Sequence, residues 1–263
     1  MLKRKVDDYL IQWKNNPDRL PLVIKGARQI GKTFSVRNFA KNYKNYIEIN
    51  FITDPQFKTI FKNGYSPESI IKEITLLKPE WEFIPNETLI LFDEIQVFPD
   101  CTTCLKFFKL DGKYDVICSG SLLGINYNQI TSVSVGYKTD YEMYSLDFEE
   151  FLWAKGYKQE QIDGILEHMI NQTPFSELEY KVWMDNFMEY VTLGGMPRVV
   201  DMFITNKNYS GTLQEQRQIL KSYEDDITKG FYAHVALGAA SKDAFDPKYF
   251  DDNNIDYGFF LRG

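Results

Sequence analysis

A lysine and a threonine that follow two glycines are the residues best suited to chemistry in this chain. The stretch "GARQIGKT" has the spacing G-x-x-x-x-G-K-[ST] of a phosphate-binding loop. In such a loop, backbone N–H groups face phosphate oxygens, and glycine allows an approach that a side chain would block. We expect Lys32 to contact the β- and γ-phosphates of a nucleotide and Thr33 to bring its hydroxyl to Mg²⁺. The residues expected to bind the nucleotide are Gly26, Ala27, Arg28, Gln29, Ile30, Gly31, Lys32 and Thr33.

Two adjacent carboxylates form the second candidate group. In "TLILFDEIQ", an apolar run ends at Asp93 and Glu94. Carboxylates at the end of a buried strand cost free energy unless something there requires them. Beside a phosphate-binding loop, Asp93 would hold Mg²⁺ and Glu94 would polarise the attacking water. A strand that simply leaves the core at two acidic residues is the alternative, just as a glycine turn is the alternative for the loop.

Small hydroxyl residues end another apolar run, "YDVICSGS". Ser119 and Ser121 would lie where the γ-phosphate of a nucleotide could be sensed. For either serine taken singly, a plain transition from strand to turn accounts for the sequence equally well. We therefore take Lys32, Glu94, Ser119 and Ser121 as the candidate catalytic residues, with Thr33 and Asp93 as the candidate metal ligands.

The elements that must position these residues alternate between strand and helix. Short apolar runs predict strands near residues 21, 46, 88, 114 and 140, and helix-like segments lie between them. This alternation, together with the phosphate-loop spacing, predicts an α/β fold of the P-loop NTPase type, in which a five-stranded parallel sheet is flanked by helices and followed by a helical region. Ligands of such sheets bind at the carboxyl ends of the strands.

The pattern changes after Gly156, where only helical segments follow. We expect residues 1–156 to form the ATPase domain and residues 157–230 a helical region that resembles a lid or a winged helix. Residues 231–263 are acidic and aromatic without clear periodicity, so we predict no definite structure for this tail. Asp147 is a candidate helix N-cap for "FEEFLWAKG", and "DYEMYSL" before it is the expected fifth strand.

Composition limits the class of protein. The chain has 263 residues, a net charge of -7 and 44% hydrophobic residues, which is typical of a folded protein. No apolar run is long enough to span a bilayer, and no signal-peptide core follows the N-terminus, so we expect a cytoplasmic protein without membrane contact. Three cysteines argue against a disulfide framework. The acidic balance makes a broad nucleic-acid surface unexpected, although a local basic patch stays open.

The C-x-x-C spacing of Cys101 and Cys104 needs separate weighing. A tetrahedral zinc site requires two further ligands, and the chain offers only Cys118, His168 and His234. We expect the two cysteines to lie about one turn apart on a helix surface rather than in a metal site. His168 lies in a helix-like segment and is expected to pack rather than to do chemistry.

Several motifs together resemble one family. "PLVIKGARQIGKT", "LILFDEIQ", "SGSLLG", "YSLDFEEFL" and "LGGMP" occur in the same order as in prokaryotic AAA+ ATPases that couple a G-x-R-Q-x-G-K-T loop to a C-terminal domain of unknown function with nuclease-like features. The resemblance covers about residues 1–229. It implies that Gly26–Thr33 bind ATP, that Asp93 and Glu94 form the Walker B pair, and that Ser119–Ser121 lie at the sensor-1 position.

The chain departs from this family in two places. The family often has an arginine after a glycine before the fifth strand, where this chain has Tyr137 and Lys138. Family members also continue beyond the position of Gly263 into their C-terminal domain, which leaves truncation, a frameshift or a naturally short chain open. Arg28 and Arg198 are the other arginines that could approach a nucleotide.

These observations predict an ATP-binding AAA+ protein that hydrolyses ATP with Mg²⁺ and changes shape during the cycle. A nucleotide-gated interaction module with little turnover is the rival from another class, and a P-loop kinase is a weaker one. The pair Asp93–Glu94 favours activation of water over phosphorylation of an acceptor. A protein partner, DNA binding and self-association all stay open.

Overall fold

Five parallel strands form one sheet in the order β2–β3–β4–β1–β5, which confirms the predicted fold class. The computed structural model describes residues 2–121 and 136–238, with side chains described as far as Asp225. The strands are β1 (Leu22–Gly26), β2 (Asn45–Asn50), β3 (Thr88–Asp93), β4 (Asp115–Ser121) and β5 (Thr139–Glu142).

The register of the sheet brings the candidate residues to one edge. Gly26 at the end of β1 lies opposite Ser121 at the end of β4, and Asn50 at the end of β2 lies opposite Asp93 at the end of β3. Because all strands run in the same direction, their carboxyl ends share this edge. The phosphate-loop candidate, the carboxylates and the serines therefore meet there.

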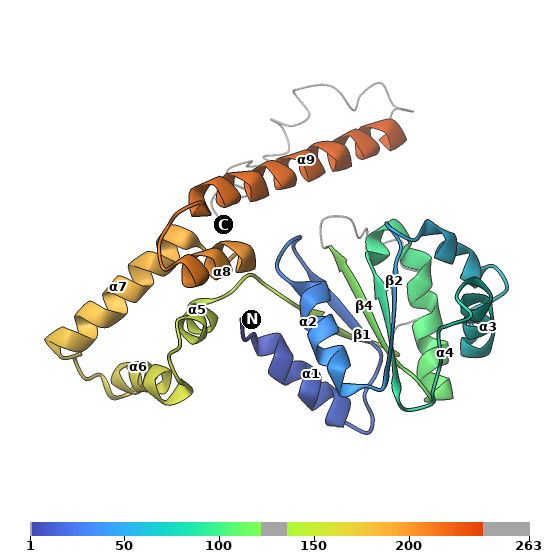
Figure 1. Ribbon diagram of the computed structural model, residues 1–263, viewed down its shortest axis with the longest axis horizontal. Coiled ribbons are helices and arrows are strands. Elements are labelled where there is room, and N and C mark those ends of the chain that lie inside the picture. Colours follow the sequence, from blue (N-terminus) through green and yellow to red (C-terminus); the bar gives the residue numbers. More distant parts are fainter. Residues whose placement is uncertain (1, 122–135, 239–263) are drawn as a thin grey trace. The chain divides into compact units, whose positions relative to one another are not determined.

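Helices cover both faces of the sheet, with α1 and α2 on one side and α3 and α4 on the other (Figure 1). Successive side chains of a strand point to opposite faces. In β3, Leu89 and Leu91 pack in one buried cluster, whereas Ile90 and Phe92 pack in the other. These helices are α1 (Lys5–Asn15), α2 (Lys32–Phe39), α3 (Pro67–Leu77) and α4 (Cys104–Asp111), and short 3-10 helices are η1 (Ala40–Asn42), η2 (Pro55–Phe61), η3 (Ile95–Val97) and η4 (Pro99–Thr103).

The cysteine prediction is wrong in one respect. Cys101 and Cys104 are not on a helix surface but fully buried, in the same core cluster as Cys118. They lie on the side of η4 and α4 that packs toward the sheet, where cysteine behaves as a small apolar residue. Burial raises the pKa of the Cys101 and Cys104 thiols, which keeps both protonated. Among the described residues, no group of three or more His, Cys, Asp or Glu side chains is arranged to hold a metal ion.

Two other elements differ from their predicted form. The fifth strand ends at Glu142 rather than at Leu146, because the Leu146 N–H donates to the carbonyl of Gly195 and not to the sheet. The helix-like segment after the second strand is a 3-10 helix, Pro55–Phe61. His168 does pack as expected, since its ring lies 4.6 Å from that of Phe175.

The helical part begins at the predicted cap. The Asp147 side chain accepts from the Glu150 N–H, and the Glu150 side chain accepts from the Asp147 N–H, which forms a capping box at the start of α5. The helices are α5 (Phe148–Ala154), α6 (Gln159–Asn171), α7 (Glu177–Leu193), α8 (Pro197–Asn206) and α9 (Thr212–Gly238).

The chain forms two compact units, Met1–Ile219 and Leu220–Gly263. Helix α9 continues from the first unit into the second, and it contains residues 231–238 of the predicted tail. Residues 239–263 lie outside the described part of the chain. The division into domains at residues 156 and 230 stays a prediction.

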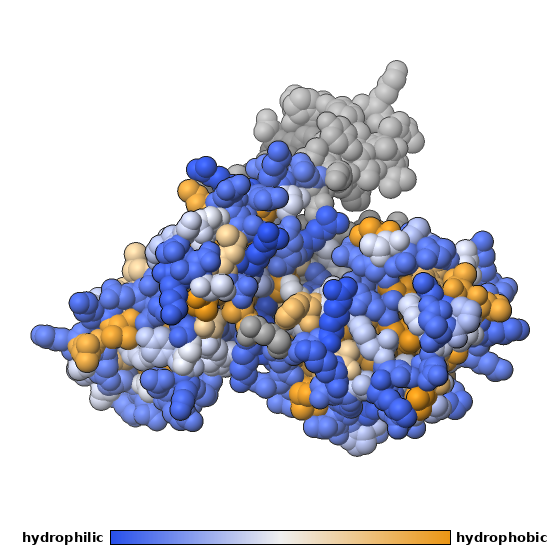
Figure 2. All heavy atoms as spheres, in the orientation of Figure 1, coloured by the Kyte–Doolittle hydropathy of each residue, from blue (hydrophilic) through white to orange (hydrophobic). Residues whose placement is uncertain are grey.

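The face of the molecule in Figure 2 is largely hydrophilic, with hydrophobic residues in separate patches. Exposed hydrophobic side chains occur on the helices that cover the sheet, such as Leu76 and Leu110, and on α6, such as Met169 and Ile170. Within residues 2–121 and 136–238, no helix has the length and apolar character needed to cross a membrane.

Candidate phosphate-binding site

The loop "GARQIGKT" runs directly from the end of β1 to the start of α2, and two of its positions require glycine. Gly26 has φ +157°, and a Cβ there would lie 2.2 Å from the carbonyl oxygen of Met143. Gly31 caps α2 with φ +94°, in the left-handed region that side chains disfavour. The loop therefore leads straight into the N-terminus of α2, where unpaired N–H groups and the helix dipole favour an anion.

The Lys32 ammonium lies inside the curve of the loop. Its Nζ donates to the carbonyl oxygens of Gly26 at 2.9 Å and Ala27 at 2.7 Å. Burial lowers the pKa of Lys32, against the opposing attraction of Glu94 and Asp93. The site thus holds a cation away from water, next to the N-terminus of a helix.

Thr33 and Asp93, the two predicted metal ligands, lie together. The Thr33 hydroxyl donates to Asp93 Oδ2 at 2.9 Å, although the residues belong to α2 and β3 respectively. The Asn50 amide, at the end of β2, donates to the same oxygen at 3.3 Å. Burial raises the pKa of Asp93, and the Thr33 hydroxyl partly opposes this shift. A hydroxyl and a buried carboxylate are oxygen donors of the kind that Mg²⁺ takes, so these residues fit that ion.

Glu94 has an unusual backbone conformation for a residue with a side chain. Its φ of 57° and ψ of 42° place it in the left-handed region, where strain is typical of functional positions. Its Oε2 accepts a hydrogen bond from the Gln96 amide. The side-chain Oε1 of Gln96 in turn accepts from the Ser121 N–H at 3.1 Å, so Gln96 connects Glu94 to the end of β4.

Ser119 and Ser121 are buried at the same edge. Among the described residues, the Ser121 hydroxyl oxygen has no hydrogen-bond partner, whereas the Ser119 hydroxyl lies close enough to Asp93 to lower the pKa of that carboxyl. Buried polar groups without a partner are uncommon in folded proteins and call for an explanation such as a bound ligand or water. Both serines are therefore brought to the site, and Ser121 pairs with Gly26 in the sheet register.

Two cavities adjoin at the loop and have Gln29, Gly31 and Phe34 in common. The first, of about 570 Å³, is lined by Arg28, Gln29, Gly31, Lys32, Thr33, Phe34, Arg37, Ile52 and Glu94. The second, of about 500 Å³, is lined by Leu2, Arg4, Gln29, Gly31, Phe34, Ser35, Pro197, Arg198 and Asp201. The first contains the charged groups of the loop, whereas the second combines apolar side chains with residues from α8.

The basic residues outside the loop divide between two places. Arg198 reaches the second cavity, where its side chain is 73% exposed and its Nε lies 3.0 Å from Glu215 Oε1. Lys138 precedes β5, whose first residue, Thr139, pairs with Leu22 at the start of β1. It therefore lies at the opposite edge of the sheet from the loop, where it pairs with Asp140 at 2.5 Å.

Sequence reasoning missed three residues of this region. The sequence held only weak signals for Asn50 and Gln96. Asn50 is an amide near the end of a predicted strand, and Gln96 lies two positions after Glu94. The sequence held no signal for Arg4, because its contacts with the loop join segments far apart in the sequence. Its guanidinium donates to the Ile30 carbonyl at 2.9 Å.

Comparison with known proteins supports the same fold. A family model described as an AAA domain matches residues 18–152, slightly more than half of the chain. No curated protein sequence matches the chain. A Walker-type ATPase of Pyrococcus abyssi has a similar fold over 90% of this chain and 77% of its own, with 14% identity and a TM-score of 0.50.

Two further structures are similar over shorter stretches. PCH-2 of C. elegans is 11% identical over 66% of this chain and 48% of its own, with a TM-score of 0.36. The Pif1 helicase of Candida albicans is 12% identical over 59% of this chain and 44% of its own, with a TM-score of 0.37.

Proposed function

The chain belongs to the AAA domain family, a family of P-loop ATPases, and from this premise we propose that it binds ATP with Mg²⁺ and hydrolyses it. The observation that carries the proposal is the contact between Thr33 and Asp93 beside the Lys32 ammonium. A hydroxyl at a helix N-terminus, a carboxylate at the end of a strand in the same sheet and a partly buried cation are the groups that a nucleotide triphosphate and its metal require.

Lys32 and the backbone of the loop would bind the phosphates. The ammonium, which donates to two loop carbonyls, can exchange those acceptors for phosphate oxygens, which are stronger because they are charged. The N–H groups at the start of α2 supply further donors. Thr33 and Asp93 would hold Mg²⁺, which neutralises the charge that develops on the phosphates during transfer.

The second cavity would take the nucleoside. It continues from the loop through Gln29, Gly31 and Phe34, and its apolar lining includes Leu2 and Pro197. A base is flat and largely apolar on its faces, so this lining suits it better than the charged cavity does. Because α8 contributes residues to this cavity, a bound nucleoside would contact both the sheet part and the helical part of the first unit. A change in shape during the ATP cycle would start from this contact.

Glu94 is the residue we assign to activation of the attacking water. It follows Asp93 directly, lines the first cavity, and accepts a hydrogen bond from Gln96. A carboxylate in that position can accept a proton from water. The hydroxyls of Ser119 and Ser121 are the candidates for contact with the γ-phosphate.

The first test is binding of labelled ATP to the parent chain and to Lys32→Ala. We expect micromolar binding by the parent, on the order of values common for nucleotide sites, and its loss in the variant. Affinity of the variant within about twofold of the parent would remove the phosphate-loop assignment, because the loop would then bind without its main cation. Phosphate release by the parent, with and without DNA, separates an ATPase from a module that only binds the nucleotide.

A further inference from the structure

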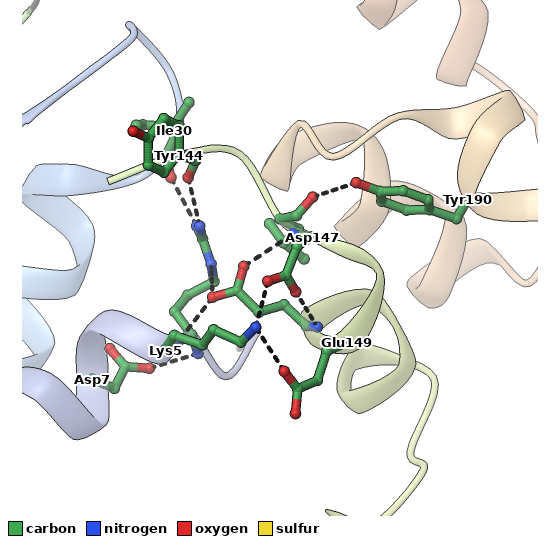
Figure 3. Close-up of polar contacts among 10 residues, drawn as sticks. Lys5, Asp7, Ile30, Tyr144, Asp147, Glu149 and Tyr190 are labelled. Atoms are coloured by element: carbon green, nitrogen blue, oxygen red, sulfur yellow. Dashed lines mark hydrogen bonds and ion pairs between the residues drawn. The ribbon is translucent and has the colours of Figure 1, made fainter. Parts of the chain in front are cut away.

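Arg4 is a buried residue whose three contacts join separate parts of the first unit. Its side chain is 6% exposed. The guanidinium donates to the Ile30 carbonyl at 2.9 Å and to the Tyr144 carbonyl at 2.7 Å, and its Nε lies 3.1 Å from Glu150 Oε1. Figure 3 shows the Ile30 and Tyr144 carbonyls converging on one guanidinium. Arg4 itself precedes residues 18–152, the part of the chain that the AAA family model matches.

The Glu150 carboxylate, which pairs with Arg4, is also buried and hydrogen-bonded within the fold. Glu150 is 4% exposed, and its Oε1 accepts from the Lys5 N–H at 2.7 Å as well as pairing with Arg4. Its Oε2 accepts from the Asp147 N–H in the capping box of α5. A buried guanidinium is tolerated only when it is paired and hydrogen-bonded, so Arg4 and Glu150 depend on each other. The pair thus connects the start of α1 to the start of α5.

The contact with Ile30 bears on the geometry of the phosphate loop. Ile30 lies between Gln29 and Gly31, which both have positive φ. A peptide group is planar, and its C=O and N–H point in opposite directions. Holding the Ile30 carbonyl on one side therefore directs the Gly31 N–H to the other side. The orientation of a loop N–H group is what a phosphate-binding loop must control.

We propose that Arg4 is a positioning residue for the phosphate loop, and that its ion pair with Glu150 makes the shape of the loop depend on how α5 is docked. The proposal rests on the proposed function in that the bound anion is taken to be a nucleotide phosphate. Displacement of α5 would withdraw the carboxylate from Arg4, and the Ile30–Gly31 peptide would lose its fixed orientation. Helix α5 and the nucleotide would in this way be coupled without direct contact between them.

The chain offers a matched control beside Arg4. Lys5 bridges the same two helices through Asp147 at 2.5 Å and Glu149 at 2.6 Å, as Figure 3 shows, yet its side chain has no contact with the loop among its hydrogen bonds and ion pairs. Lys5→Gln therefore removes a half-exposed ion pair between α1 and the start of α5, while the buried Arg4–Glu150 pair and the Ile30 contact remain to hold α5 and the loop. Arg4→Lys keeps the positive charge but removes the planar fork that reaches two carbonyls and a carboxylate together.

The experiment compares the parent, Arg4→Lys and Lys5→Gln by two measurements. The first is hydrogen exchange of the segment 26–34 without nucleotide, and the second is the affinity for labelled ATP. We expect faster exchange and a loss of affinity on the order of tenfold in Arg4→Lys, the size of effect typical when a supporting contact at a ligand site is removed. We expect Lys5→Gln to keep the parent's exchange in this segment and its affinity.

Each of the remaining outcomes contradicts either the role proposed for Arg4 or the proposed function. Parent-like exchange and affinity in Arg4→Lys, or an equal loss in Lys5→Gln, would show that Arg4 only docks α1. If Arg4→Lys does not fold, Glu150→Gln replaces it, and unchanged exchange of segment 26–34 in that variant would overturn the proposal. If the parent does not bind ATP, the proposed function fails, while hydrogen exchange without nucleotide still tests the role of Arg4.

Discussion

At the scale of single residues, burial decides the chemistry of the charged groups at the phosphate loop. Lys32 and Asp93 are both removed from water, which lowers the pKa of the amine and raises the pKa of the carboxyl. Both shifts favour the uncharged forms, and a bound phosphate with its metal would favour the charged forms again. Burial therefore disfavours the charged forms of Lys32 and Asp93, and binding of Mg-ATP would offset that cost.

The Lys32 shift predicts how ATP affinity depends on pH. Because the pKa of Lys32 is lowered from 10.5, the ammonium loses its proton at a lower pH than an exposed lysine does. Binding of a phosphate requires the charged form, so ATP affinity should fall as pH rises through the lowered pKa. Lys32→Arg keeps its charge in this range and should show a flat profile, whatever its absolute affinity. Titration of labelled ATP against pH measures both, and parallel profiles would contradict the role given to Lys32.

Glu94→Gln should retain Mg-ATP and lose turnover. Asp93 and Thr33 remain to hold the metal, whereas the group that accepts a proton from water is gone. We expect turnover to fall by about 10² to 10⁴, the usual contribution of a general base. The matched control is Glu87→Gln, because Glu87 precedes the same strand at the opposite edge of the sheet and its side chain pairs with Lys44 at the surface. Parent-like phosphate release by Glu94→Gln would mean that another residue activates the water.

At the scale of elements, the link between β5 and α5 is held by the loop between α7 and α8. The Leu146 N–H donates to the Gly195 carbonyl at 2.7 Å, and the Tyr190 hydroxyl donates to the Leu146 carbonyl at 2.9 Å. This packing sets where α8 begins, and with it the side of the second cavity that Pro197 lines. Close backbone contact at Gly195 is therefore a requirement for the position of α8.

Gly195→Ala should destabilise the fold. A Cβ there would lie 2.1 Å from the Leu146 carbonyl oxygen, and backbone cannot move aside as a flexible side chain can. We expect the free energy of unfolding to fall by about 1–3 kcal/mol, as for other overpacked sites. Gly164→Ala in α6 is the control, because a Cβ there meets nothing within 4 Å and alanine favours a helix by up to about 1 kcal/mol. Thermal unfolding should move the two variants in opposite directions, and a stable Gly195→Ala would contradict the packing described.

At the scale of the whole molecule, the question is which cation stimulates hydrolysis. Lys138 lies near the position where the prokaryotic AAA+ family that the sequence resembles has an arginine. It is at the edge of the sheet opposite the phosphate loop. Arg198 and Arg37 line the cavities but are paired with Glu215 and Glu48 respectively, and Arg28 belongs to the phosphate loop itself. A neighbouring subunit or a partner is therefore the source we expect, and hydrolysis by the dilute chain should be slow.

Single-turnover hydrolysis over a range of protein concentrations tests this expectation. An arginine placed on the transferred phosphate raises turnover by about 10³ to 10⁵, so a rate that climbs with protein concentration would show that another copy supplies it. A rate on the order of 1 per second at all concentrations would mean that one chain is sufficient. In that case Arg198→Ala distinguishes the source, because loss of the rate would assign the role to Arg198.

Local patterns in the sequence were enough for most of the elements and for the grouping of the candidate residues. Glycine spacing, the apolar runs and the Asp147 cap each depend on neighbouring residues, and all three are found in the structure where they were expected. The same holds for the meeting of Lys32, Thr33 and Asp93, since parallel strands bring their carboxyl ends to one edge.

Only the tertiary structure decided which distant groups support that site. The Arg4 side chain contacts carbonyls 26 and 140 residues away, and no spacing rule connects them. The burial of Cys101 and Cys104, likewise, depends on which side of their helices meets the sheet. Hydrogen bonds within an element follow from the order of residues, whereas contacts between elements follow from packing, and packing is settled by the whole chain at once.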